Sequence, residues 1–203
     1  GRMGVDIPKY DLQVYGSLLV EPNERVSSDI ISGAGSRWMW YSDRSVLRIG
    51  YTPSIYWDDA YSGDDSIAFG YATIAQGNHS IVGGGYYNLA QADWAVIAGG
   101  SDNIIRGEQG IILGGQKNTI RSESSIILGG LDNIASKNAV VLGGFDNASF
   151  GVGGVVSGYR NFSSGEEILI LGGKNNTGFA PKSYLIGSNI TTLEEHSHSL
   201  LIN

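Results

Sequence analysis

Residues 111–118 read IILGGQKN, and residues 126–133 repeat the pattern as IILGGLDN. The same order of three apolar residues, two glycines, two variable residues and an asparagine returns at 140–147 as VVLGGFDN. The glycine pairs begin at positions 114, 129 and 143, which gives a period of roughly 14 to 15 residues. A unit of that length is too short for a strand plus a helix, but it suffices for two short strands and two tight corners. Such a unit is one coil of a β-solenoid.

The repeat extends in both directions from these units, over residues 66–203. We take the second position of each glycine pair as an anchor, and the anchor recurs nine times with the same period. The anchors are Tyr71, Gly85, Gly100, Gly115, Gly130, Gly144, Gly158, Gly173 and Ser188. A partial tenth unit follows at 199–202. The sequence therefore predicts an all-β protein, a parallel β-solenoid or β-roll of nine to ten coils.

Glycine and asparagine have separate roles in this repeat. Gly accounts for 31 of the 203 residues, and it supplies the positive φ that tight corners need. Asn tolerates positive φ better than most residues do, and it lies three residues after seven of the nine anchors. Stacked amides can also hydrogen-bond from coil to coil, so we expect these Asn residues to form a ladder along the solenoid.

The apolar runs point to an assembly of several chains. Successive residues of a strand face opposite sides, so three apolar residues in a row give a strand that is apolar on both faces. One face fills the interior of the coil. The other face needs a cover, and the repeat leaves no room for a helix. We therefore expect a homo-oligomer.

Residues 66–81 read SIAFGYATIAQGNHSI, and this stretch resembles the YadA-like head repeat of trimeric autotransporter adhesins. The resemblance extends over 66–203 and implies a left-handed parallel β-roll, three copies of which pack around a threefold axis. The many longer units, the Gly pair and the Asn slot depart from that family's pattern. Coiled-coil heptads and a membrane-anchor segment are not seen in the sequence.

Residues 1–65 form a separate region. Residues 4–16 resemble a short segment that precedes fibrous domains in phage tail-fibre proteins, which implies an interwoven trimeric β segment. Residues 37–41 and 45–50 predict a hairpin with a turn at 42–44. Three of the four Trp residues lie at Trp38, Trp40 and Trp57. We interpret 1–65 as an N-terminal β segment whose aromatic residues cap the first coil, with an exposed aromatic sugar platform as the alternative.

The variable positions one and two residues after each anchor are the candidates for ligand binding. They change in size and charge between coils, so they should face solvent at a corner, although packing against a neighbouring protomer would also explain the large ones. Aromatic rings beside polar groups suit sugar recognition. The candidate ligand-binding residues are Tyr86, Tyr87, Phe145, Tyr159 and Arg160, with Trp57 added from the cap.

Composition narrows the function classes. There are 13 Lys and Arg against 20 Asp and Glu, a net charge of −7, which argues against nucleic acid as a partner. No run approaches the length of a spanning helix, so we expect no membrane insertion. The absence of Cys excludes disulfides and thiolate chemistry. His196 and His198 lack an evident third metal ligand, and the acidic residues between Asp58 and Asp65 lack a calcium-motif spacing. We therefore expect no catalytic residues, metal or cofactor.

The sequence thus predicts a non-enzymatic, trimeric module on a cell surface or virion that binds a host-surface glycan or protein. It would serve as an adhesin head or a phage tail-fibre segment. A structural spacer without a ligand is the first alternative. An ice-binding solenoid is the second, although no Thr column is present. A left-handed β-helix acyltransferase would need coils of about 18 residues, which this repeat does not match.

Overall fold

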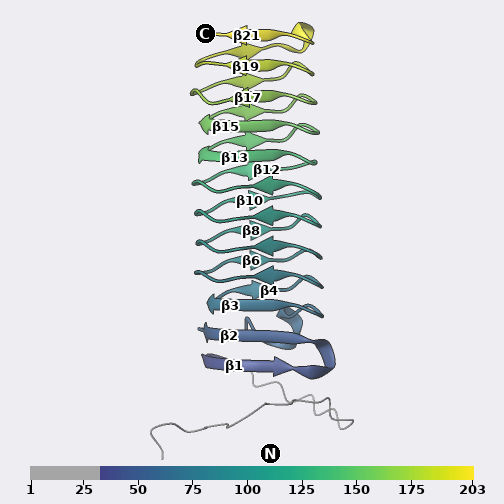
Figure 1. The fold of residues 1–203 in the computed structure, drawn as a ribbon, viewed down its shortest axis with the longest axis vertical. Coiled ribbons are helices and arrows are strands. Elements are labelled where there is room, and N and C mark those ends of the chain that lie inside the picture. Colours follow the sequence, from purple (N-terminus) through teal and green to yellow (C-terminus); the bar gives the residue numbers. More distant parts are fainter. Residues whose placement is uncertain (1–32) are drawn as a thin grey trace, which may run out of the picture.

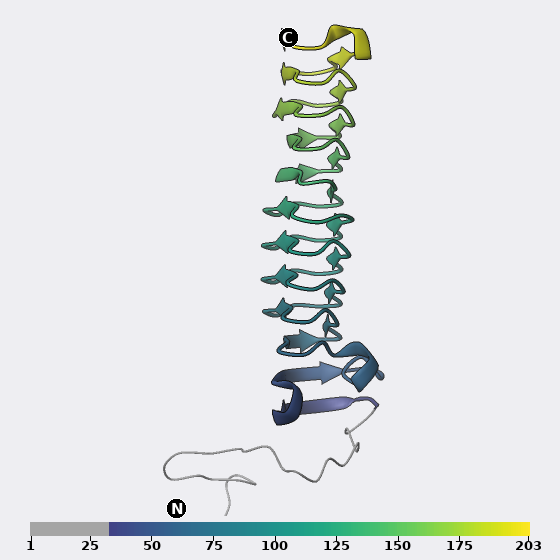
Figure 2. The same ribbon diagram turned by 90° about the vertical axis from the view of Figure 1, so that its right-hand side faces the viewer.

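The computed structural model describes residues 33–203, which form a rod of stacked coils (Figure 1). Each coil contributes one strand to each of two parallel sheets, and the two sheets form separate columns when the rod is turned (Figure 2). The expected parallel β-solenoid is confirmed, and equivalent positions of successive coils, such as Asn103 and Asn118, are 15 positions apart. The region 1–32, including the fibre-like segment at 4–16, lies outside the described residues.

Sheet A runs the whole length of the described rod, and sheet B runs along its opposite side. The strands of sheet A are β1 (Gly35–Tyr41), β2 (Val46–Thr52), β3 (Ile67–Tyr71), β5 (Ile81–Val82), β7 (Val96–Ile97), β9 (Ile111–Ile112), β11 (Ile126–Ile127), β13 (Val140–Phe145), β15 (Val155–Tyr159), β17 (Leu169–Leu171), β19 (Tyr184–Ile186) and β21 (Leu200–Ile202). The strands of sheet B are β4 (Ile74–Ala75), β6 (Leu89–Ala90), β8 (Ile104–Ile105), β10 (Thr119–Ile120), β12 (Ile134–Ala135), β14 (Ala148–Ser149), β16 (Phe162–Ser163), β18 (Thr177–Gly178) and β20 (Thr191–Thr192). Three short 3-10 helices are η1 (Ser42–Arg44), η2 (Asp59–Tyr61) and η3 (Glu194–His196).

The core is a narrow column between the two sheets. The second residue of each short strand points inward, so Ile112 and Ile127 of sheet A and Ile120 of sheet B are fully buried. Side-chain volume is balanced across the column. Gly110 faces the isoleucines of sheet B, and a Cβ there would lie 2.7 Å from Cγ2 of Ile105. Each coil therefore stacks on the next with similar residue types above one another, which fixes the register.

An asparagine ladder runs beside this apolar column. The seven Asn residues are almost completely buried: Asn88, Asn103, Asn118, Asn133, Asn147, Asn161 and Asn176. In each step the backbone N–H of one Asn donates to Oδ1 of the Asn one coil earlier, as from Asn147 to Asn133 at 3.0 Å. Nδ2 donates to glycine carbonyls of its own coil and of the next one. The expected ladder is therefore present, and it ties the corners of successive coils together.

The corner geometry differs in detail from the expectation. The second glycine of each pair has positive φ, as at Gly115 with +85° and Gly130 with +92°, and a Cβ on Gly115 would lie 2.2 Å from the carbonyl oxygen of Gly130. The first glycine, as at Gly114, has open space beside it. Positive φ falls on the residue before the ladder Asn, as at Asp102 with 55°, and not on the Asn itself.

The structure also corrects the frame of the two outermost units. Gly70, and not Tyr71, stacks on Gly85, because a Cβ on Gly70 would lie 2.5 Å from the Gly85 carbonyl oxygen. Tyr71 instead aligns with Tyr86. At the other end Gly187, and not Ser188, lies above Gly173. Both shifts occur where the sequence lacks a glycine pair, so the pattern alone offered two alignments.

An antiparallel hairpin caps the N-terminal end of the solenoid. Strands β1 and β2 pair with Trp38 opposite Ile49, and β2 then pairs in parallel with β3, so sheet A continues into the cap. The exposed edge of β4 receives side-chain donors from the cap. Trp57 Nε1 donates to the carbonyl of Thr73 at 2.8 Å, and the Arg48 guanidinium donates through Nη2 to the carbonyl of Ala75 at 3.1 Å.

Candidate functional site

One edge of the rod collects the variable residues that follow the anchors. We call it the aromatic edge, and the backbone pairing places its members directly above one another. From the N-terminal end they are Tyr51, Tyr71, Tyr86, Ser101, Gln116, Leu131, Phe145, Tyr159 and Lys174. Adjacent members lie in successive coils, which stack at about 4.8 Å. The aromatic residues therefore form two groups, separated by three non-aromatic positions.

The first group is a tyrosine stack. The rings of Tyr51 and Tyr71 lie 5.1 Å apart at 22°, and those of Tyr71 and Tyr86 lie 4.9 Å apart at 18°. Tyr87 packs edge-on against Tyr86 at 4.5 Å. Loss of solvent contact, and then the neighbouring phenols of Tyr71 and Tyr86, raise the pKa of the Tyr87 hydroxyl. The group presents four tyrosine side chains to solvent.

The second group lies farther along the same edge. The rings of Phe145 and Tyr159 stack at 5.2 Å, and the guanidinium of Arg160 lies 5.1 Å from the Tyr159 ring and 5.9 Å from the Phe145 ring. Asp146 lies 3.5 Å from Arg160 Nε. The sequence grouped Phe145, Tyr159 and Arg160 as candidates, and the structure brings these three together.

The stacking changes what these rings can offer a ligand. Both faces of Tyr71 are covered, by Tyr51 on one side and Tyr86 on the other. A sugar ring needs a free aromatic face, so it cannot lie flat within the stack. At Tyr71 the solvent side of the stack therefore consists of ring edge and hydroxyl, which make hydrogen bonds and van der Waals contacts.

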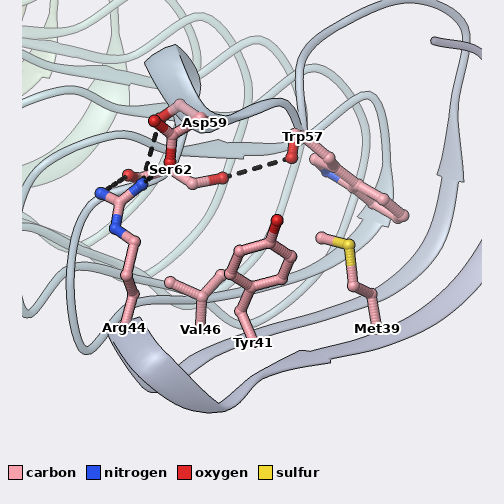
Figure 3. A pocket seen from close by; sticks show the side chains of 7 residues that line it. All are labelled: Met39, Tyr41, Arg44, Val46, Trp57, Asp59 and Ser62. Atoms are coloured by element: carbon pink, nitrogen blue, oxygen red, sulfur yellow. Dashed lines mark hydrogen bonds and ion pairs between the residues drawn. The ribbon is translucent and has the colours of Figure 1, made fainter. Parts of the chain in front are cut away.

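Trp57 does not belong to this surface. The residue is 1% exposed, and its indole N–H donates to the carbonyl of Thr73, the residue before β4. Figure 3 shows Trp57 beside Met39 and Tyr41, which come from β1. The hollow lined by these residues holds only about 10 Å³, roughly one water site. The prediction that Trp57 contacts a ligand is therefore wrong, because a ligand cannot reach this buried residue. Trp57 belongs to the cap.

The acidic residues near the cap are paired with an arginine. The guanidinium of Arg44 donates hydrogen bonds to the carboxylates of Asp59 and Asp64. It also donates to the carbonyl of Ser62 (Figure 3 shows Asp59 and Ser62). Partial burial opposes the charge of Arg44, but the two carboxylates outweigh it and raise the pKa of the guanidinium. Within residues 33–203 no group of three or more His, Cys, Asp or Glu side chains could hold a metal ion.

The outer face of sheet A carries two uncharged apolar rows. The row at the third strand position includes Leu113, Leu128 and Leu142, which are 51%, 43% and 44% exposed. The row at the first position is half-buried and includes Ile111 and Ile126. The outer face of sheet B adds a third row, half-buried and mostly apolar: Ile74, Leu89, Ile104, Thr119, Ile134, Ala148, Phe162 and Thr177. Exposed apolar rows of this length are typical of interaction surfaces.

Two members of the tyrosine stack were not among the sequence candidates. Tyr51 lies in the cap, and Tyr71 was assigned to the glycine slot. The available signal was the dipeptide Gly-Tyr, which occurs as Gly50-Tyr51, Gly70-Tyr71 and Gly85-Tyr86. It shows that the hairpin strand β2 follows the corner pattern of the solenoid, although the loop between β2 and β3 hides the periodicity.

A scan against protein-family models found no match, and a search of curated proteins found no related sequence. Among residues 33–203 no helix is long and apolar enough to cross a membrane.

Proposed function

We propose that this chain is a non-enzymatic binding module of a cell surface or virion, displayed as a rigid trimeric rod. The aromatic edge is its proposed contact with a host-surface glycan or protein. We also propose that the chain is related to trimeric adhesin heads and that its coils are left-handed, as this resemblance implies. Neither a nucleic acid nor a membrane is part of it.

The observation that carries the proposal is that the fold does not need aromatic residues at this edge. The same slot holds Ser101, Gln116 and Lys174 in other coils, and these coils stack with the same backbone pairing. Four tyrosines lie together in the cap and the first coils, and each is at least 37% exposed. The solenoid fold therefore does not require them. Exposed tyrosines add contact area with little loss of side-chain entropy, which is why binding surfaces use them.

The apolar rows on the outer faces of the two sheets support the proposal of a trimer. A ring of identical subunits joins two different patches of each subunit, whereas a twofold dimer uses one patch against itself. Each coil offers two separate patches, the outer faces of sheet A and sheet B, and none of the three apolar rows on these faces carries a charged residue. Three copies would cover both faces and would raise avidity through three equal binding edges.

The binding experiment replaces the tyrosines by residues that the fold already uses in the same slots. In Tyr86→Ser with Tyr87→Asp the corner copies Ser101-Asp102, so the variant should fold and sediment as the wild type does. We expect binding to host cells to fall by at least tenfold. Unchanged binding by this variant would move the contact elsewhere. No binding by the wild type would favour the structural spacer.

A further inference from the structure

The opposite edge of the rod carries an exposed tryptophan, Trp94. This edge holds the residues that connect sheet B back to sheet A, and in successive coils its left-handed slot contains Asp65, His79, Trp94, Gln109 and Ser124. Trp94 is 55% exposed. Its backbone is fixed by the donation of its N–H to the carbonyl of Asn78 at 2.9 Å. A large apolar ring thus projects from a rigid corner.

The fold does not favour tryptophan at this position. The slot has positive φ in coil after coil, and Trp94 itself has φ of 59°. Glycine and asparagine adopt this conformation most easily, and the same slot holds Asn138 and Gly153 farther along the rod. The solenoid does not require a bulky side chain here, since Asp65, Gln109 and Ser124 occupy the same slot, so the exposed indole points to a contact outside the chain.

The surroundings of Trp94 hold one face of the indole and leave more than half of the residue exposed. The imidazole of His79 stacks beneath the indole at 4.0 Å and 23°. His79 is itself held by Asp65, whose carboxylate lies 3.4 Å from Nδ1. On the other side, Oε1 of Gln109 accepts a hydrogen bond from Ser124 Oγ at 3.2 Å, so that carboxamide is drawn toward the next coil. No second aromatic ring among the described residues covers Trp94.

Polar groups flank this ring. Asp93 precedes it, and Oδ1 of that carboxylate accepts the backbone N–H of Asn78 at 2.8 Å, which leaves Oδ2 as an acceptor. Glu108 and the Gln109 amide are exposed one coil farther on. An apolar platform bordered by carboxylates and an amide matches a pyranose, whose ring face is apolar and whose rim is lined with hydroxyls.

We infer that Trp94 is the platform of a carbohydrate site, in which a pyranose ring stacks on the exposed indole, on the side away from His79, and donates hydroxyl hydrogen bonds to Asp93 and Glu108. His79, supported by Asp65, is a positioning residue that holds the indole in place. The inference rests on the proposed surface-binding function and names its ligand class. It differs from the aromatic edge, where the tyrosine rings cover one another.

The test uses Trp94→Asn, because asparagine occupies the same slot at Asn138 and suits its backbone. We expect this variant to unfold at the same temperature as the wild type or a higher one and to sediment identically. Binding to an array of immobilised pyranose glycans should fall at least tenfold, and quenching of tryptophan fluorescence by methyl pyranosides should disappear. Trp94→Tyr should restore part of the binding, and Tyr86→Ser should leave pyranoside quenching unchanged.

The failures of the two proposals are distinguishable. If the wild type binds host cells but no pyranoside, or if Trp94→Asn binds pyranosides normally, the inference is wrong and the surface-binding function stands. If Trp94→Asn changes the oligomeric state, the indole belongs to a subunit contact and the inference is again wrong. If the wild type binds neither cells nor glycans, both proposals are wrong.

Discussion

The backbone N–H of Asn118 donates to Oδ1 of Asn103, one coil earlier, at 3.0 Å. Nδ2 of Asn118 donates to the carbonyls of Gly114 at 3.1 Å and Gly130 at 3.0 Å. One buried amide thus joins three consecutive coils. A glycine is required beside it, since a Cβ on Gly115 would lie 2.7 Å from that Nδ2.

The first prediction concerns this amide. Asn118→Asp keeps the shape of the side chain but replaces the Nδ2 donor with an oxygen that faces two carbonyls. We expect the free energy of unfolding to fall by about 3–5 kcal/mol at pH 7, because a buried charge is left without a partner. Burial should raise the pKa of the introduced carboxyl, so the loss should shrink as the pH falls and the group becomes protonated. Urea denaturation at pH 7 and pH 4 measures both effects, and a loss that does not depend on pH would contradict this account.

The same substitution at the two glycines of one corner should change stability by very different amounts. Gly115→Ala places a methyl group against the Gly130 carbonyl, and we expect a loss of about 3 kcal/mol or more from overpacking and backbone strain. Gly114→Ala meets open space, so its effect should stay within about 1 kcal/mol. Thermal unfolding of the two variants side by side checks the difference. Equal losses would show that the corner frame is wrong.

The third prediction concerns a buried cation without a carboxylate partner. Arg48 is fully buried, its Nε has no acceptor among the described residues, and burial lowers its pKa to about 10. The carbonyls of Ser66 and Ala75 also accept backbone N–H groups, so they stay paired without Arg48. We expect Arg48→Met to raise the free energy of unfolding at pH 7 by about 1–4 kcal/mol.

The pH dependence of this gain follows from the direction of the pKa shift. Between about pH 10 and the higher, ordinary pKa of arginine the unfolded wild type binds more protons at Arg48 than the folded form does, so wild-type stability rises with pH in that window. The advantage of Arg48→Met should therefore shrink from pH 7 to pH 11. Other titrating groups are common to both proteins and cancel in the difference. A less stable variant at pH 7 would mean that the arginine hydrogen bonds outweigh its desolvation.

The fourth prediction tests the assembly. Leu113→Lys with Leu128→Lys puts two charges into the exposed row of sheet A without touching the core. A charged row cannot be buried against another subunit, so we expect folded monomers in analytical ultracentrifugation, while the wild type sediments as a trimer. Glu108→Lys changes an exposed corner and serves as the control that should remain trimeric. A monomeric wild type would refute the trimer.

The repeating part of the fold could be predicted because each slot has one physical task. Ile112 had to point inward, Gly115 had to avoid a Cβ, and Asn118 had to bond along the axis, so their recurrence defines the coil. The cap follows no repeat, and the burial of Trp57 depends on a loop that returns to β4. The stacking of Tyr51 on Tyr71 depends on the pairing of β2 with β3, which the periodicity of the sequence does not reveal. The exposed position of Trp94 could not be predicted, because the residue type in its slot varies from coil to coil and its left-handed backbone is known only from the structure.

The direction of the hydrogen bonds has a mechanical consequence. Ladder bonds, such as that between Asn118 and Asn103, lie along the rod axis, so tension on the ends pulls them apart one coil at a time, as in peeling. A folded coil adds about 4.8 Å to the rod, whereas the same stretch of chain extends to about 50 Å when released. In a rod held between two surfaces, each coil that unfolds would therefore lengthen about tenfold and absorb work while the remaining coils stay folded.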